Sequence, residues 1–214
     1  HAVKKDLIKT YNVIDASITV AYPGVSDVFS ATGKILNRDR QYFLFVGSLK
    51  KGKNVSMIIN AFAKFLTHAN TRYELLLIGS NYWEDIQIDK PIIKNHLEDH
   101  VKRMGFVSDS DLACYYRGAT AFISPSIAEG FGMPVVEAMA SGCPVIVSDS
   151  SIFKETVGDA GIFVNPLDEN DISQAMQKVL DISTRNDMEK IGIERSQLYK
   201  WELFMQIVRR CIES

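Results

Sequence analysis

SPSIAEGFGMPVVEAMASGCPVIVSD, residues 124–149, is the stretch that decides the fold class of this 214-residue chain. It leads from the end of an apolar run through a glycine-rich loop into a helical pattern, and then through a tight turn into a second apolar run. Pro134 suits the start of the helix, where the amide that proline lacks would have no intrahelical partner. A strand, a helix and a second strand in this order predict a parallel sheet with helical crossovers.

The same alternation extends through most of the chain. Several apolar runs carry no polar position, as expected of strands that are covered on both faces. The pattern predicts an α/β fold with a doubly wound, Rossmann-like parallel sheet. The predicted strands are Ser17–Ala21, Tyr42–Val46, Glu74–Ile78, Val101–Met104, Ala121–Ser124, Pro144–Ser148 and Ile162–Val164, and the predicted helices are Asn54–Leu66, Ser110–Arg117, Pro134–Ala140, Asp171–Leu180 and Trp201–Ile212.

The composition is that of an ordinary globular domain. Hydrophobic residues make up 46% and charged residues 23%, and the net charge of −2 indicates no nucleic-acid partner. The three cysteines, Cys114, Cys143 and Cys211, are odd in number and far apart, which favours a reducing compartment over a disulfide scaffold or a structural zinc. No apolar run reaches the roughly 18 residues of a membrane span. We expect a cytoplasmic protein and, because the chain begins at His1 rather than Met, a fragment.

Glycines follow three of the predicted strands. Gly47 follows YFLFV, Gly79 follows ELLLI, and the glycine-rich segment 124–132 follows TAFI. The carboxyl ends of parallel strands share one edge of the sheet, and open α/β sheets bind ligands there. The sequence therefore predicts one crevice lined by these three loops.

Two carboxylates flank the glycine-rich loop. Glu129 lies in the loop, and Glu137 lies just inside the following helix. A carboxylate accepts two hydrogen bonds at once, so each can hold the paired hydroxyls of a ribose or a hexose. The alternatives are a loop turn for Glu129 and a helix-dipole partner for Glu137. Free amides at the start of the helix would favour an anion or hydroxyls, and we expect them at Gly132, Met133 and Val135.

GSLKKGKN, residues 47–54, fits the P-loop pattern GxxxxGK between a strand and a helix. A P-loop places a Ser or Thr hydroxyl on magnesium at the position of Asn54, and no later strand ends in the Asp that completes such a site. Phosphate can still bind at a helix start beside lysines. An ATPase or GTPase site and a solvated lysine turn remain alternatives for this loop.

His96 and His100 stand four residues apart on a predicted helix, as in the zinc motif HExxH. Leu97 takes the place of the general base, and no third ligand is evident. We interpret both as solvated histidines and expect no metal site.

The glutamates of EGFGMPVVEA, Glu129 and Glu137, resemble the EX7E signature of retaining GT-B glycosyltransferases of family 4. HAVKKDLIKTYNV with ITVAYPGVSDVF resembles the start of the family's C-terminal domain, and YFLFVGSLKKGKNV its first strand and phosphate loop. ELLLIG and VKRMGFVSDSDLACYYRGA resemble the pieces that hold the base, and AGIFVNPLDENDISQAM and KWELF the closing elements. The resemblance implies one donor-binding domain over residues 1–214, with 1–30 leading from an absent N-terminal domain and 201–214 as a closing helix.

The resemblance also implies residue roles. Glu129 would be the catalytic residue, on the 3- and 4-hydroxyls of the transferred sugar, and Glu137 would bind the ribose. Lys53 would neutralise the diphosphate without a metal or other cofactor. Many members carry Arg at Ser48 or just before the lysine, so Lys50 or Lys51 would compensate. Backbone around Phe106 and Val107 would contact the base, and Gly79 would leave room for it. The backbone amides of Phe131, Gly132 and Met133 would bind the sugar or the distal phosphate.

The complete enzyme is then expected to transfer a hexose from a nucleoside-diphosphate sugar with retention of configuration. GSLKKGKN favours mannose from GDP-mannose. The acceptor would be a glycan or lipid-linked glycan of a bacterial polysaccharide, bound by the N-terminal domain, with the protein peripheral to the inner face of the plasma membrane. This chain alone would bind donor without turnover. A nucleotide-sugar sensor or a sugar-nucleotide epimerase on the same fold is the alternative.

Overall fold

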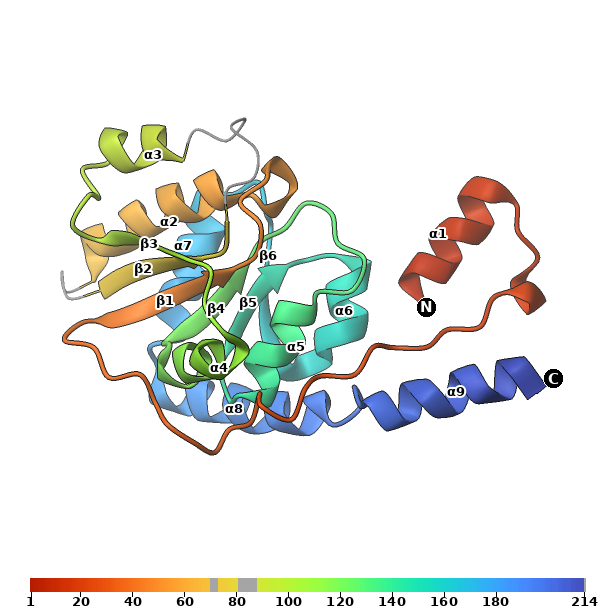
Figure 1. The fold of residues 1–214 in the computed structure, drawn as a ribbon. Coiled ribbons are helices and arrows are strands. Elements are labelled where there is room, and N and C mark those ends of the chain that lie inside the picture. The colour runs from red at the N-terminus through yellow and green to blue at the C-terminus, as the bar shows by residue number, and fades with distance from the viewer. Residues whose placement is uncertain (70–72, 81–87, 214) are drawn as a thin grey trace.

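A six-stranded sheet forms the centre of the computed structural model, which describes residues 1–69, 73–80 and 88–213 (Figure 1). Its strands lie in the order β3-β2-β1-β4-β5-β6, and every neighbouring pair is parallel. The α/β prediction is confirmed, and each of these strands lies within one residue of its predicted bounds. They are β1 (Gln41–Val46), β2 (Tyr73–Ile78), β3 (Val101–Gly105), β4 (Ala121–Ser124), β5 (Val145–Ser148) and β6 (Gly161–Val164).

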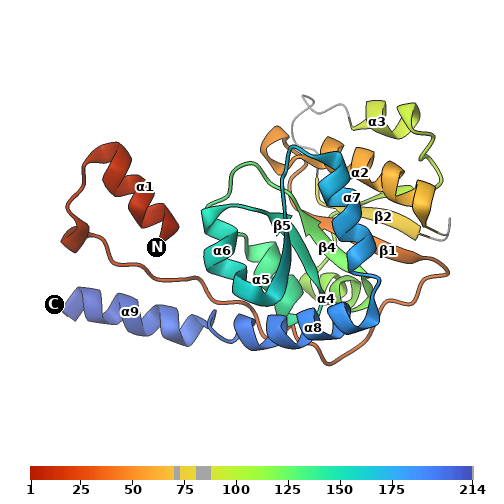
Figure 2. The ribbon, with the colours of Figure 1, turned by 180° about the vertical axis from the view of Figure 1, so that it is seen from behind.

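Helices cover both faces of the sheet (Figures 1 and 2). The helices are α1 (Ala2–Tyr11), α2 (Val55–His68), α3 (Asp89–Lys94), α4 (Asp109–Gly118), α5 (Met133–Ala140), α6 (Ser151–Val157), α7 (Glu169–Lys178), α8 (Ile182–Ser196) and α9 (Trp201–Glu213), with 3-10 turns at Asp15–Ser17, Lys51–Lys53 and Gly158–Ala160. Within the described ranges, no helix combines the length and apolar content that a membrane span requires.

The sheet divides the core into two halves. Phe43 and Phe45 of β1 are fully buried among α2 and α7 side chains, whereas Tyr42 and Leu44 are buried among those of α4, α5 and α6. Successive side chains of a strand point to opposite faces, so a strand with helices on both faces is apolar at consecutive positions. This explains the unbroken apolar runs of the sequence.

The strand order reverses between β1 and β4. From β1 the chain adds β2 and β3 on one side, then returns to place β4, β5 and β6 on the other. The loops that follow β1 and β4 therefore leave neighbouring strand ends in opposite directions, which creates the usual ligand position of open α/β sheets. The predicted phosphate loop and the glycine-rich loop are these two loops.

The predicted strand Ser17–Ala21 is wrong. Ser17 ends a 3-10 turn, and residues 18–21 pair with no strand in the described parts of the chain. Residues 18–21 all line the pocket beside α1, where Ile18 and Val20 are partly buried and Thr19 is exposed. An extended segment in which burial alternates from residue to residue has the same period of two as a strand.

The helices α1, α3, α6 and α8 were not predicted from the apolar pattern. In α8 the buried positions are Met188, Gly192 and Ser196, each four residues apart, and two of the three are small or polar. A Cβ on Gly192 would lie 3.5 Å from Met139 Cγ of α5, so the helices pack closely at this glycine. Hydrophobic periodicity does not reveal a face built from small residues.

Candidate functional site

The loops that follow β1, β2 and β3 are bound to one another by their backbones. The Gly47 amide donates to Ile78 O at 3.0 Å, and the Gly79 amide donates to Gly105 O at 2.8 Å. A Cβ on Gly79, whose φ is +132°, would lie 2.1 Å from Gly47 O. No side chain fits there. The close approach of the two loops therefore requires glycine at position 79, independently of its predicted role in leaving room for a nucleobase.

The β1 loop is also bound to the loop after β4. The Ile127 amide donates to Gly52 O at 2.9 Å. Asn54 donates through Nδ2 to Pro125 O at 3.1 Å and to Pro166 O at 2.6 Å. Asn54 has a left-handed φ of +60°, which Asn tolerates better than most residues. At the position where a P-loop holds a magnesium-binding hydroxyl, this chain therefore has an amide that joins three loops.

Lys53 and Glu129 face each other across the β1–β4 switch point. Lys53 ends the 3-10 turn after β1, Glu129 lies in the loop after β4, and Lys53 Nζ forms an ion pair with Glu129 Oε1. Their side chains are only 15% and 12% exposed. The structure thus brings together the predicted diphosphate cation and the predicted sugar carboxylate.

Backbone amides without acceptors among the described residues lie at the start of α5, a few residues after Glu129 in the chain. Gly132 is the N-cap with φ +92°, and a Cβ there would lie 2.6 Å from Phe153 Cε1. The amides of Phe131, Gly132 and Met133 have no acceptor within the described parts of the chain. The Val135 amide was predicted to be free, which is wrong, because it donates to Gly132 O at 2.9 Å as the first turn closes. The helix begins at Met133, so Pro134 is its second residue.

Glu137 lies one turn into α5, with a buried partner that the sequence did not indicate. Tyr116 of α4 donates its hydroxyl to Glu137 Oε2 at 3.1 Å. Its ring is fully buried, edge-on to Phe29 and Phe122. Burial raises the pKa of Glu137, the hydrogen bond from Tyr116 lowers it, and the charge of Asp109 raises it, with a net upward shift. The sequence feature that could have identified this partner is a tyrosine on the apolar face of the predicted helix Ser110–Arg117.

The predicted base contacts lie at the end of β3, two strands from β1. Gly105 ends the strand with φ +68°, Phe106 is 87% exposed, and Val107 packs against the core. Ser48 follows β1, and its carbonyl accepts from the Lys50 amide at 2.9 Å.

His96 and His100 do not lie on one helix, so that prediction is wrong. α3 ends at Lys94, and His96 has a φ of +54° in the following turn. His100 Nδ1 lies 2.9 Å from Tyr73 O. The described residues contain no group of three side chains able to hold a metal ion.

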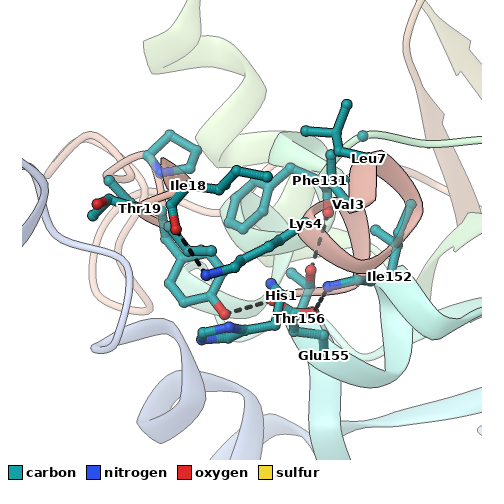
Figure 3. Close-up of a pocket in the computed structure, with 16 residues that line it drawn as sticks. His1, Val3, Lys4, Leu7, Ile18, Thr19, Phe131, Ile152, Glu155 and Thr156 are labelled. Carbon is teal, nitrogen blue, oxygen red and sulfur yellow. Dashed lines mark hydrogen bonds and ion pairs between the residues drawn. The ribbon is translucent and has the colours of Figure 1, made fainter. Parts of the chain in front are cut away.

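A concavity adjoins the glycine-rich loop at Gly130 and Phe131 (Figure 3). It has a volume of about 290 Å³ and lies between α1, residues 18–23 and α6. Lys4 Nζ donates to Ile18 O at 2.8 Å, and Glu155 of α6 accepts from the Ala2 amide and the Tyr22 hydroxyl. These polar groups are engaged with one another, so they hold α1 and the segment after it against α6.

Comparison with known proteins shows which family and which proteins this chain is similar to. Residues 30–195 match the family described as glycosyl transferases group 1. O-antigen chain mannosyltransferase B of Escherichia coli is 33% identical over 162 residues, which cover 75% of this chain and 42% of that protein. O-antigen chain mannosyltransferase RfbU of Salmonella typhimurium is 34% identical over 181 residues, covering 84% and 49%. The chain thus spans about half the length of these relatives.

A solved structure agrees with the fold over the whole chain. Sucrose-phosphate synthase of Thermosynechococcus elongatus superposes with a TM-score of 0.83 at 27% identity, covering 99% of this chain and 56% of that one. The sequence match includes both glutamates, the phosphate loop and the strands that position them. This chain therefore belongs to the glycosyl transferases group 1 family.

Proposed function

We propose that this chain is the nucleotide-sugar-binding half of a retaining glycosyltransferase that transfers a hexose to a glycan. The observation that carries the proposal is the convergence of Lys53, Glu129 and the open amides of α5 at the switch point of the sheet. A cation and helix N-terminal amides bind phosphates, and a carboxylate accepts hydrogen bonds from sugar hydroxyls. Glu137 adds a second carboxylate for the ribose, and exposed Phe106 with Val107 offers a surface for the base.

In the proposed reaction, the bond from the anomeric carbon to the diphosphate oxygen breaks and a bond to the acceptor oxygen forms on the same face. The acceptor hydroxyl loses its proton, and the nucleoside diphosphate leaves with the electron pair of the broken bond. Lys53 and the amides of Phe131, Gly132 and Met133 would stabilise the growing charge on the diphosphate, so the step requires no metal ion. Glu129 would hold the transferred sugar in place.

We further propose mannose from GDP-mannose as the donor. The GSLKKGKN loop supports this choice, as do two O-antigen chain mannosyltransferases at 33% and 34% identity. The same likeness supports a glycan or lipid-linked glycan acceptor in bacterial polysaccharide synthesis. An N-terminal acceptor domain and a position at the inner face of the plasma membrane belong to the same proposal.

A thermal-shift panel of GDP, UDP, ADP and their sugars, run with a chelator, tests the function. At a ligand concentration of 100 times the Kd, binding adds about 2.7 kcal/mol, which corresponds to a rise of roughly 5–10 °C in Tm for a chain of this size. We expect GDP and GDP-mannose to give this rise. Lys53→Ala should weaken GDP binding about tenfold without affecting guanosine, because a charge-assisted hydrogen bond to phosphate is lost. The panel is repeated with magnesium in place of the chelator and with ATP and GTP added; binding that required magnesium and preferred ATP or GTP would contradict the proposal.

A further inference from the structure

The Lys53–Glu129 ion pair joins the two groups that the proposed donor must contact separately. Both side chains are largely buried, and the loops that carry them are fastened together by the Ile127–Gly52 hydrogen bond and by Asn54. Lys50 and Lys51, the other lysines of the loop, are exposed. The inward-facing cation of the phosphate loop is therefore already neutralised by a carboxylate of the same chain.

A ligand phosphate must compete with this carboxylate for Lys53. Losing one partner of a buried ion pair is far more costly than losing a partner of an exposed pair, because the charge left behind has already lost its water. When a diphosphate takes Lys53, Glu129 is left beside a second anion. The free-energy cost of ligand binding therefore depends on which groups Glu129 contacts once the diphosphate has bound Lys53.

We infer that the pair makes the site select the complete nucleotide sugar over the bare nucleoside diphosphate. This inference rests on the proposed function. With a nucleotide sugar, the displaced Glu129 carboxylate accepts hydrogen bonds from the sugar hydroxyls and so regains partners. With the bare diphosphate there is no sugar, and Glu129 faces the terminal phosphate at close range, where like charges repel. Glu129 thus weakens retention of the product nucleotide as well as holding the sugar of the donor.

Isothermal titration calorimetry with GDP and GDP-mannose on the 214-residue chain tests this inference. The wild type should bind GDP-mannose more tightly than GDP. Glu129→Gln is nearly isosteric and removes the charge, so it should tighten GDP binding about tenfold while GDP-mannose binds no more tightly than before. The ratio of the two dissociation constants should therefore fall to about one or invert.

Glu169→Gln is the matched control. Glu169 pairs with Lys64 at 3.1 Å, between α2 and α7, so the control makes the same change in net charge in a more exposed ion pair away from the proposed site. It should leave both affinities unchanged. That result would separate competition for Lys53 from an effect of the protein's net charge on nucleotide binding. Thermal unfolding of both variants shows that the fold is intact.

The outcomes distinguish the inference from the function on which it rests. If Glu129→Gln leaves both affinities unchanged or weakens both equally, the ion pair only fastens two loops and the inference is overturned. If the folded wild type binds none of the nucleotides or nucleotide sugars in the panel, the proposed function fails instead. If UDP and UDP-glucose bind in place of the guanosine ligands, the same ratio is measured with them.

Discussion

At the scale of single residues, Glu137 has opposite effects on folding and on the proposed binding. Burial raises its pKa in the folded state, so this group favours the fold at low pH, and its contribution is lost as pH rises through the raised pKa. Ribose binding needs the ionised carboxylate as an acceptor and is therefore lost as pH falls through the same pKa. The Tyr116 hydroxyl stabilises the ionised form, so we expect it to act as a positioning residue for the proposed ribose site.

Tyr116→Phe should weaken binding of the nucleoside diphosphate about three- to tenfold at neutral pH, since it removes one hydrogen bond to a charged group. Without that bond the pKa of Glu137 rises further, so the loss of affinity on acidification should begin at a higher pH than in the wild type. Calorimetric titration from pH 5 to 8 measures both effects.

Tyr42→Phe is the matched control for this prediction. Tyr42 is also a buried tyrosine, and its hydroxyl donates to Tyr115 O at 2.8 Å, away from Glu137. It should not change the pH profile of binding. Parallel weakening by Tyr116→Phe at every pH, with no displacement of the profile, would mean that Tyr116 acts only through packing.

At the scale of elements, the start of α2 is fastened to two other loops by Asn54. Its Nδ2 donates to carbonyls in the loop after β4 and in the loop after β6, and its backbone is left-handed. Asn54→Ala removes both hydrogen bonds. It also leaves an alanine at positive φ, where the alanine side chain cannot form the local hydrogen bonds that help asparagine to adopt this conformation. We expect a loss of about 2–4 kcal/mol in the free energy of unfolding, measured by urea denaturation.

Asn54→Gly separates the two causes. Glycine also lacks the side-chain amide but adopts positive φ without strain, so it should be about 1 kcal/mol more stable than the alanine variant. Should both variants unfold at the wild-type urea concentration, the side-chain hydrogen bonds of Asn54 contribute nothing to stability. The loops then owe their positions to the Ile127–Gly52 bond and the core beneath them.

At the scale of the whole molecule, α1 and α9 extend beyond the layered part of the structure, as Figures 1 and 2 show. α9 buries none of its residues, and Trp201, Met205 and Ile212 are 49%, 58% and 79% exposed. Gly24 packs directly against Trp201 at the base of this helix. An exposed apolar helix face of this kind favours association.

Ending the chain after Phe204 should lower Tm by less than about 4 °C, because α9 buries none of its residues and a loss of about 1 kcal/mol corresponds to roughly 2–4 °C in a chain of this size. Nucleotide binding should persist, and the truncated chain should self-associate less at high concentration. Calorimetry and light scattering after gel filtration measure these outcomes. A fall in Tm of more than about 5 °C would show that α9 contributes to the core.

Much of the fold was predictable because its signals are local. Apolar runs, the glycines after strands and the helix start near Pro134 each depend on neighbouring residues, and they placed the six strands and the two candidate loops. The errors also have a local cause. Residues 18–21 share the alternation of a strand. The packing face of α8 includes Gly192 and Ser196, which give no apolar signal in the sequence.

By itself, the sequence determined the class of the sheet, the loops at its carboxyl edge and the identity of the two glutamates, since periodicity and motif spacing are properties of short stretches. Only the tertiary structure decided what those residues contact. Lys53 and Glu129 are 76 residues apart, Tyr116 and Glu137 are 21 apart, and Asn54 and Pro166 are 112 apart. Such contacts depend on the strand order and on which helix faces which, and these follow from packing the whole core rather than from any one segment.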